Sequence, residues 1–396
     1  MRSLLIIFAY ATLVFSFDNK CSYRRTAAIL KRSTYDFSVR LLDRVSQETN
    51  EHFVYSPLST WLQLASLAEG ATNYTLNEIW SITRHHRRYC LKEIWKQIIN
   101  KMDADLETVY KRKSVLVIDK LLNVKKSFIK NVEKLKSLKV LLYNFNNEIG
   151  AADGVNNYIE EATDGEITDV VYPDDFDSTL ALMVGAVYYS NAWKMAFNPV
   201  YTQLQPFHTR EYSDNVNMMK QIGYYNITEI PVINSTVLEI PCQDDRVSML
   251  FFLPKSQSAV DLFYSLRKIH LITIKRLFKN NGPKLVNVEL PRFNITTDID
   301  SIPELIHDMG AKRLFHPKRA EFNGISDYPV YTSLMAQVVY IEVTEHGVKG
   351  EALAENMVLD DKPIDFIVNK PFAFMLVDKV TDLILFAGAY SVPSVF

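Results

Sequence analysis

Residues 341–372 read IEVTEHGVKGEALAENMVLDDKPIDFIVNKPF, and this stretch carries more information about fold and function than any other part of the 396-residue chain. A β-branched run from Val338 to Val343 predicts a strand that leads into it. Beyond Gly347, every second side chain is small or apolar, and mostly charged residues stand between. The small or apolar positions are Val348, Gly350, Ala352 and Ala354. Because strand side chains alternate between two faces, the segment can bury one face in a sheet, and it also suits an exposed loop.

A segment able to be both a loop and an inserted strand resembles the reactive-centre loop of the serpin family. Within it, the NKPF motif at 369–372 looks like the strand by which that loop returns to the body. Further motifs similar to serpin sequences follow one another from about residue 30 to the C-terminus. They are FVYSPLS (53–59), VNNYIE (155–160), VYY (187–189) with Trp193, MMK (218–220), FFLP (251–254), LPRF (290–293), FNGIS (322–326) and FAG (386–388). Each motif is weak alone, but the ordered set is specific, so the chain is identified as a divergent member of the family.

The resemblance implies an α+β serpin fold with three β-sheets, about nine helices and an exposed reactive-centre loop at about residues 345–368. Apolar periodicity predicts helices in 33–46, 58–68 and 91–101, and strands at 249–253 and 286–290. Helices early and strands late favour an α+β body. With 48% hydrophobic residues and no low-complexity linker, the chain favours one large core. We expect a single serpin domain over residues 17–396.

Local catalytic motifs are what would indicate an enzyme. The sequence contains no nucleophile elbow, no His-Glu-x-x-His, no phosphate loop and no dinucleotide glycine pattern. We therefore expect a protein that is not an enzyme. The resemblance implies an inhibitor of serine proteases that acts as a suicide substrate: the protease cuts a bait bond, forms an acyl-enzyme, and is trapped when the cut loop inserts into the main sheet. The alternative is a non-inhibitory serpin that carries a ligand or binds a partner.

Insertion requires that the inward-facing loop positions be small or apolar, because a buried unpaired charge is very costly. The resemblance assigns this hinge to Glu345, Gly347, Val348, Gly350, Ala352 and Ala354. Lys349 and Glu351 stand where many inhibitory serpins have glutamate and alanine, and Leu353 is bulkier than usual. We expect these three side chains to face solvent after insertion.

Two further regions of the main sheet control its opening in serpins, the breach and the shutter. The resemblance assigns Trp193 to the breach, and Ser56, Ser59, Gly185 and Gln337 to the shutter. Family members often pair an asparagine with a histidine at the positions of Gly185 and Gln337. This departure predicts altered sheet opening.

The bait bond has several candidates. Counting forward from the hinge, as in typical family members, places the reactive bond at Asp361–Lys362, whereas counting back from NKPF places it at Asp360–Asp361. Lys362 precedes Pro363, and proline after the cut generally blocks trypsin-like cleavage. Leu359 is the candidate for a chymotrypsin-like protease. An acidic bait residue is unusual and keeps the non-inhibitory alternative open.

The N-terminus predicts secretion. A positive start, Met1-Arg2-Ser3, is followed by an apolar run that is too short for a bilayer span but suits a signal peptide, which we place at residues 1–16. We expect an extracellular glycoprotein. Its acceptor triplets begin at Asn73, Asn226, Asn234 and Asn294, of which two or three are expected to be used. Asn294 is the doubtful one, because it abuts a family-like strand.

Charge and cysteine content limit the partners. With 44 basic and 46 acidic residues the chain is nearly neutral, so we expect no nucleic acid and no membrane as a partner. Ten basic residues lie between 111 and 139, including Lys126, Lys130 and Lys134 at helical spacing; they are either a solvated face or a glycosaminoglycan site. No Cys/His spacing suits a metal, so we predict neither metal nor cofactor. We expect a monomer.

Cys21, Cys90 and Cys242 are too few for a disulfide framework, and their odd number leaves at least one unpaired. The sequence leaves their pairing open.

Overall fold

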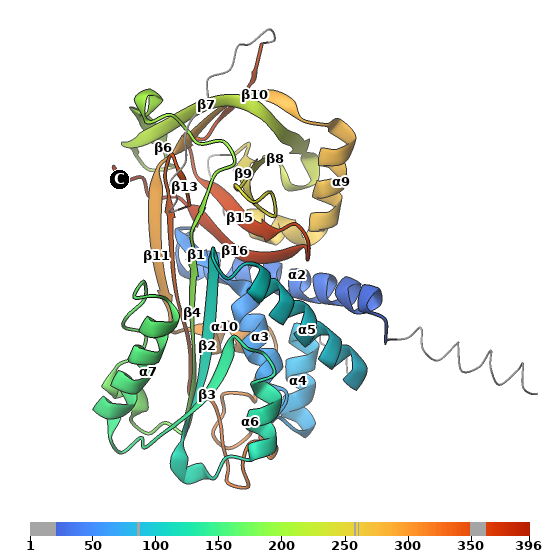
Figure 1. The fold of residues 1–396 in the computed structure, drawn as a ribbon. Helices are drawn as coiled ribbons and strands as arrows, with labels where there is room; N and C mark the ends of the chain where they lie inside the picture. The colour runs from blue at the N-terminus through green and yellow to red at the C-terminus, as the bar shows by residue number, and fades with distance from the viewer. Residues whose placement is uncertain (1–20, 85–87, 257–258, 260, 349–361) are drawn as a thin grey trace, which may run out of the picture.

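The computed structural model describes residues 21–84, 88–256, 259, 261–348 and 362–396. Nine α-helices lie within these ranges (Figure 1). They are α2 (Tyr23–Glu48), α3 (Pro57–Leu67), α4 (Asn73–Thr83), α5 (Tyr89–Asp105), α6 (Lys126–Val132), α7 (Glu148–Ala162), α8 (Leu262–Ser265), α9 (Leu271–Asn281) and α10 (Ile302–Asp308). Within the same ranges, no helix has the length and hydropathy that a membrane span requires.

The strands form two sheets. The sheet that contains β4 and β12 is called the main sheet, and the second sheet is the larger one. The strands of the main sheet are β2 (Tyr110–Asp119), β3 (Leu138–Tyr143), β4 (Ala181–Tyr189), β5 (Asn191–Ala192), β11 (Phe293–Ile299), β12 (Leu334–Val343) and β13 (Gly347–Val348). The strands of the second are β1 (Phe53–Tyr55), β6 (Gln203–His208), β7 (Ser213–Ile230), β8 (Ser235–Pro241), β9 (Val247–Pro254), β10 (Lys284–Pro291), β14 (Ile364–Ile367), β15 (Phe372–Asp378) and β16 (Leu383–Tyr390).

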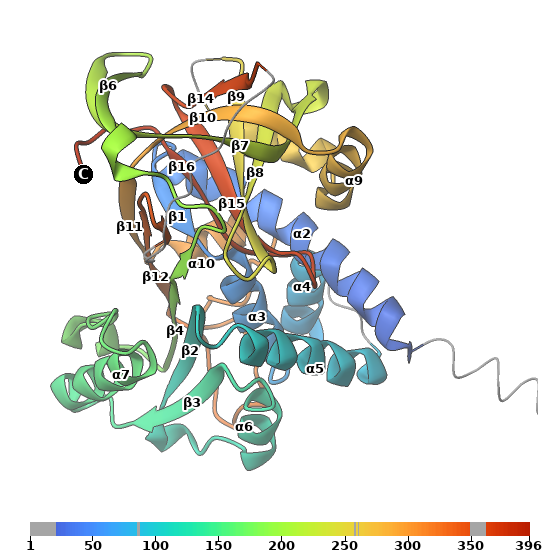
Figure 2. The same cartoon turned by 45° about the horizontal axis from the view of Figure 1, so that its top comes forward.

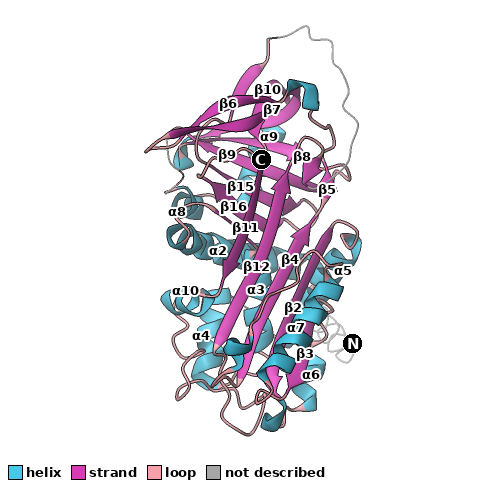
Figure 3. Ribbon diagram, turned by 90° about the vertical axis from the view of Figure 1, so that its left-hand side faces the viewer, coloured by secondary structure: helices cyan, strands magenta, loops and turns pink. Residues whose placement is uncertain are grey.

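In the main sheet, β4 and β12 are direct neighbours. Figure 3 shows β3, β2, β4, β12 and β11 side by side in this order. The short strand β13 pairs with both β12 and β5. β12 pairs with β4 in parallel, from Leu334 opposite Leu182 to Val339 opposite Val187. Along this paired length the two strands bond to each other, so the sheet is closed between them.

The main sheet is covered on both faces. Figure 1 shows α7 on one side of it and α3 and α5 on the other. Residues of β12 alternate accordingly: Met335, Val339 and Ile341 belong to the large core, whereas Leu334 and Val338 pack against the smaller cluster that contains residues of α7.

The resemblance implies three sheets, and the second sheet of this structure corresponds to two of them. The long strand β7 belongs to both and so joins them. β7 has 18 residues, enough to pair with β10 through residues 218–225 and with β8 through residues 226–230. Figure 2 shows β7 and β10 crossing the upper part of the molecule, with β6 and β14 beside them.

The predicted helices are present. α2 and α5 contain the stretches 33–46 and 91–101 and extend beyond them, and α3 contains residues 58–67 of the predicted 58–68. The predicted strands at 249–253 and 286–290 lie in β9 and β10. The interpretation of NKPF as the returning strand is wrong: the strand that follows the loop is β14, and residues 369–371 lie between β14 and β15. Pro371 has no N–H to donate to a ladder.

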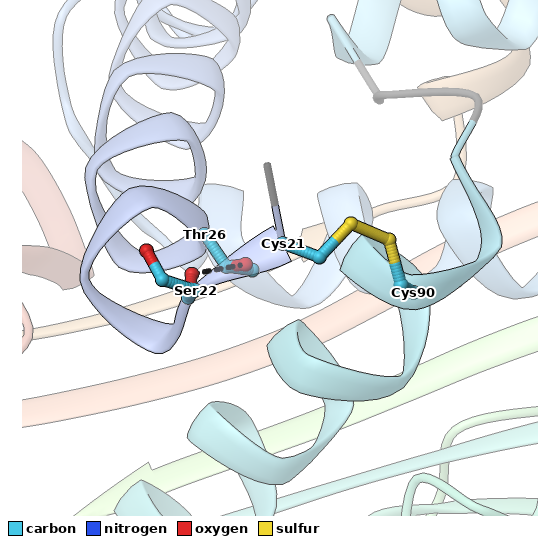
Figure 4. The surroundings of a disulfide bond; sticks show 4 residues. All are labelled: Cys21, Ser22, Thr26 and Cys90. Atoms are coloured by element: carbon cyan, nitrogen blue, oxygen red, sulfur yellow. Dashed lines mark hydrogen bonds between the residues drawn. A yellow bond between two sulfur atoms is a disulfide. The ribbon is translucent and has the colours of Figure 1, made fainter. Parts of the chain in front are cut away.

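A disulfide joins Cys21 to Cys90 and so ties the start of α2 to the first turn of α5 (Figure 4). Ser22 beside it caps α2, since its side-chain hydroxyl oxygen accepts a hydrogen bond from the Arg25 backbone N–H at 3.3 Å. Its backbone carbonyl accepts a hydrogen bond from the Thr26 hydroxyl at 3.0 Å. Cys242 is free and buried. Burial raises the pKa of its thiol to about 12, so it is unreactive near neutral pH.

Candidate functional site

The chain turns sharply where β12 ends, and its first residues beyond the turn already form a strand. The turn is closed by two backbone hydrogen bonds, from Thr344 N to Gly347 O at 2.9 Å and from Gly347 N to Thr344 O at 3.3 Å. β13 then runs between β12 and β5, with Val348 opposite Val343 of β12 and Asn191 of β5. The Val348 side chain is fully buried. The hinge therefore begins inside the main sheet.

Gly347 is the residue that permits this close approach. Its φ is +152°, and a Cβ on it would lie 2.3 Å from Asn191 O and 2.6 Å from the Ala192 Cα. Those atoms belong to the backbone of β5 and cannot move aside locally. A side chain at position 347 would force β13 away from β5.

Trp193, the predicted breach residue, makes two hydrogen bonds to this turn. Its indole N–H donates to Thr344 O at 2.9 Å, and its backbone N–H donates to His346 O at 3.0 Å. The side chain is buried, at 1% exposure. The structure thus brings the predicted breach residue and the predicted hinge together.

Glu345 is a buried carboxylate whose partners the sequence did not indicate. It is 4% exposed, accepts a hydrogen bond from the Thr202 hydroxyl at 2.7 Å, and lies 3.7 Å from Nη1 of Arg292. The Arg292 guanidinium also lies 5.3 Å from the centre of the Phe396 ring. Arg292 belongs to the LPRF motif, but nothing in the sequence pairs it with residue 345. A buried charge needs such partners.

Gln337, a predicted shutter residue, joins β12 to the start of α3. The Ser56 backbone N–H donates to its Oε1 at 2.8 Å, and its Nε2 donates to Ser56 O at 3.2 Å. The Ser56 hydroxyl in turn donates to Leu385 O at 2.7 Å. Gln337 is fully buried. The predicted shutter residues Ser56 and Gln337 therefore contact each other directly.

Replacing Gln337 with alanine is expected to destabilise the intact protein by about 1–3 kcal/mol, because it leaves the buried backbone N–H of Ser56 without its partner. Chemical unfolding in urea measures this. The matched control is Gln203→Ala, at an exposed position of β6, which should change stability by less than about 0.5 kcal/mol. Equal stability of wild type and Gln337→Ala would show that the hydrogen bonds between the Gln337 amide and the Ser56 backbone do not stabilise the intact protein.

The remaining shutter residues lie on the other side of the same crossing. Gly185 of β4 is opposite Gln337 of β12 and opposite Ser114 of β2. The hydroxyls of Ser59 and Ser114 are 3.4 Å apart. Gln63 of α3 also reaches this point and was not singled out from the sequence, although a polar residue within an apolar helix was the available signal.

Part of the predicted site lies outside the described residues. Gly350, Ala352 and Ala354 of the hinge do, and so do the bait candidates Leu359, Asp360 and Asp361. Lys362 is exposed and stands two residues before β14.

The four acceptor asparagines differ in exposure. Asn73, at the start of α4, and Asn234, before β8, are exposed. Asn226 and Asn294 are half-buried in β7 and β11, and the Asn226 amide donates to Glu239 at 2.8 Å.

The three lysines predicted at helical spacing are not equivalent. Lys126 and Lys130 are exposed on α6. Lys134 pairs with Glu93 at 3.0 Å, so part of its charge is already balanced.

Known proteins resemble this chain over most of its length. The glia-derived nexin of Rattus norvegicus is 26% identical over 360 residues, 88% of this chain and 89% of that protein. Neuroserpin of Homo sapiens is 27% identical over 373 residues, 89% of each. Among solved structures, native protease nexin-1 with heparin has a TM-score of 0.82 at 23% identity, and maspin has 0.82 at 22%; each match covers 93% of this chain and 100% of the other.

The model of one protein family, Serpin (serine protease inhibitor), matches residues 32–393. That match spans nearly the whole chain, and it agrees with the fold. The chain belongs to the serpin family.

Proposed function

We propose that this serpin is a secreted suicide inhibitor of an extracellular serine protease, trapping it as an acyl-enzyme by loop insertion between β4 and β12. The observation that carries the proposal is the strand β13. Val348 is already paired with β12 in the antiparallel direction that an inserted loop needs. This pairing supports insertion, because the first residue of the inserted strand would already be in place in the intact protein.

Continuing the register that Val348 begins supports the predicted hinge. Antiparallel continuation along β12 would put Gly350 opposite Ile341, Ala352 opposite Val339 and Ala354 opposite Gln337. Directly opposite residues of two antiparallel strands share a face. On β12 these three positions are buried toward the large core. The small or apolar loop residues would thus enter the core, where charge is excluded.

The same register changes the expectation for Leu353. We expected its side chain to face solvent, but position 353 would lie opposite Val338, which packs against the cluster containing residues of α7. A bulky apolar side chain suits that position. Glu351 would lie opposite Tyr340, on the same half-buried face.

The disulfide supports secretion. A structural disulfide persists in oxidising compartments and is rare in the cytosol, and Cys21–Cys90 is one. We retain the signal peptide at residues 1–16, the mature domain at 17–396, and glycans on exposed acceptors such as Asn73 and Asn234.

The bait bond in this proposal remains Asp361–Lys362, with Asp360 and Leu359 as alternatives. The exposed Lys362 supports access by a protease. A glycosaminoglycan is a proposed second partner. It would bind the exposed Lys126 and Lys130, and the similarity to a structure of nexin-1 with heparin supports it.

The second candidate function is ligand carriage without inhibition. The observation that favours it is a surface cavity of about 470 Å³ between α2 and the end of α4. Arg25, Arg32 and Arg84 line it, together with Asp36, which pairs with Arg84 at 3.2 Å. Such a cavity is large enough for a small organic anion.

Incubation with a panel of serine proteases tests the proposal. We expect one trypsin-like or chymotrypsin-like member to form a complex that survives SDS, because its acyl-enzyme is covalent. The control is the same protease with its nucleophilic serine replaced, which should form no such complex. Cleavage of the loop by every member, with no SDS-resistant complex from any, would contradict inhibition and favour the carrier.

A further inference from the structure

The first turns of α3 contact three neighbouring strands of the main sheet at one crossing. Gln337 of β12 bonds to Ser56 at 2.8 and 3.2 Å. Ser114 of β2 has its hydroxyl 3.4 Å from both the Ser59 hydroxyl and the Gln63 Nε2. Between these strands, β4 presents Gly185, which has no side chain to bond with α3.

Gln63 fills the space that a side chain at position 185 would occupy. A Cβ built on Gly185 would lie 2.8 Å from Gln63 Nε2. Gln63 is fully buried, and within the described part of the chain its Oε1 has no hydrogen-bond partner. A buried amide that is only half satisfied is costly in a helix whose other residues are also buried. Its position therefore calls for an explanation beyond packing.

The contacts on the two sides of Gly185 differ in strength. The bonds from Gln337 to Ser56 have ordinary lengths, whereas the two contacts to Ser114 are near the outer limit for hydrogen bonds. If β4 leaves β12, the weaker contacts break first. β2 and β4 then move together, and β12 stays attached to α3. In the register that β13 begins, Ala354 would enter beside Gln337, where Gly185 now lies.

We propose that Gln63 is a positioning residue for sheet opening. In the closed sheet it occupies the space over Gly185 and holds β2 by a weak contact, and it releases that contact when β4 and β12 separate. This inference rests on the proposed function, because loop insertion is what separates the two strands.

The test compares Gln63→Ala with wild type, each as intact protein and after a single cut in the loop. We expect the thermal unfolding midpoint of the intact variant to fall by about 3 °C, because the cavity left over Gly185 and the lost contact with Ser114 outweigh the removal of the half-satisfied amide. The cut variant should unfold at the wild-type midpoint, because the Gln63 contact is absent once the loop is inserted. The control is Leu64→Ala, a core truncation on the same helix. It should lower the unfolding midpoints of the intact and the cut protein equally.

A second substitution checks that Gln63 and Gly185 share one space. Gly185→Asn alone should lower the intact midpoint, because the new side chain collides with Gln63. Combined with Gln63→Ala, it should restore the intact midpoint. Additive losses in the double variant would overturn the inference, and so would equal losses in the intact and cut forms of Gln63→Ala. A wild-type midpoint that does not rise on cutting would contradict loop insertion, and therefore the proposed function itself. The role of Gln63 in sheet opening would then be contradicted as well, because it depends on insertion.

Discussion

Cutting the loop between Met357 and Lys362 is expected to raise the midpoint of thermal unfolding by on the order of 10 °C. The reason is the register of β13. Once cut, residues after Val348 are free to continue along β12 and to pair with β4 on the other side. A strand bonded on both sides gains many ladder hydrogen bonds, each contributing about 0.5–1.5 kcal/mol net.

The measurement is differential scanning calorimetry of intact protein and of protein cut by a protease that is not inhibited. As a control, a cut in another exposed segment should lower the midpoint or leave it unchanged, because it supplies no strand. An unchanged midpoint after loop cleavage would mean that the loop does not insert. The carrier function would then be the better explanation.

Replacing Val348 with aspartate is expected to convert the inhibitor into a substrate. Val348 is fully buried between β12 and β5, and an unpaired carboxylate there costs several kcal/mol. In the intact variant the aspartate would leave this site for solvent, and insertion would then have to bury it. Because each 1.4 kcal/mol slows a step about tenfold, insertion should lose the competition with hydrolysis of the acyl-enzyme. The ratio of SDS-resistant complex to cleaved protein should fall at least about tenfold.

Val348→Ala is the matched control, since it removes a similar amount of apolar surface without adding charge. It should keep most of the complex. Circular dichroism of both variants establishes that they are folded before the ratio is measured. A Val348→Asp variant that forms as much complex as wild type would show that position 348 does not face the core during insertion.

The sequence predicted the fold class because its signals are local and numerous. The early helices and the strands at 249–253 and 286–290 follow from apolar periodicity, and the alternation after Gly347 indicated which loop residues can be buried. The prediction was wrong at NKPF. This motif was interpreted as a strand because it resembles one in the family, although Pro371 has no N–H to donate to a neighbouring strand. The boundary of β14 depends on pairing with β10, which no local pattern specifies.

The candidate site was predicted in part. The sequence identified Gly347, Trp193 and Gln337, and the structure brings Trp193 to the turn that precedes Val348 and Gln337 to Ser56. It did not identify Thr202 as a partner of Glu345, 143 residues away along the chain. Which residues contact Glu345 depends on which strands become neighbours in the fold. Neighbouring strands can come from any part of the sequence, so no local pattern indicates these contacts.

The sequence by itself determined the alternation of small and charged residues in the loop, because side-chain size and charge are properties of each position. Only the tertiary structure decided that Val348 is paired between β12 and β5 and that Cys21 pairs with Cys90. It also placed the Gln63 side chain over Gly185, and this depends on the angle and depth at which α3 crosses the sheet. Packing of the whole core sets that geometry, and a linear pattern does not record it.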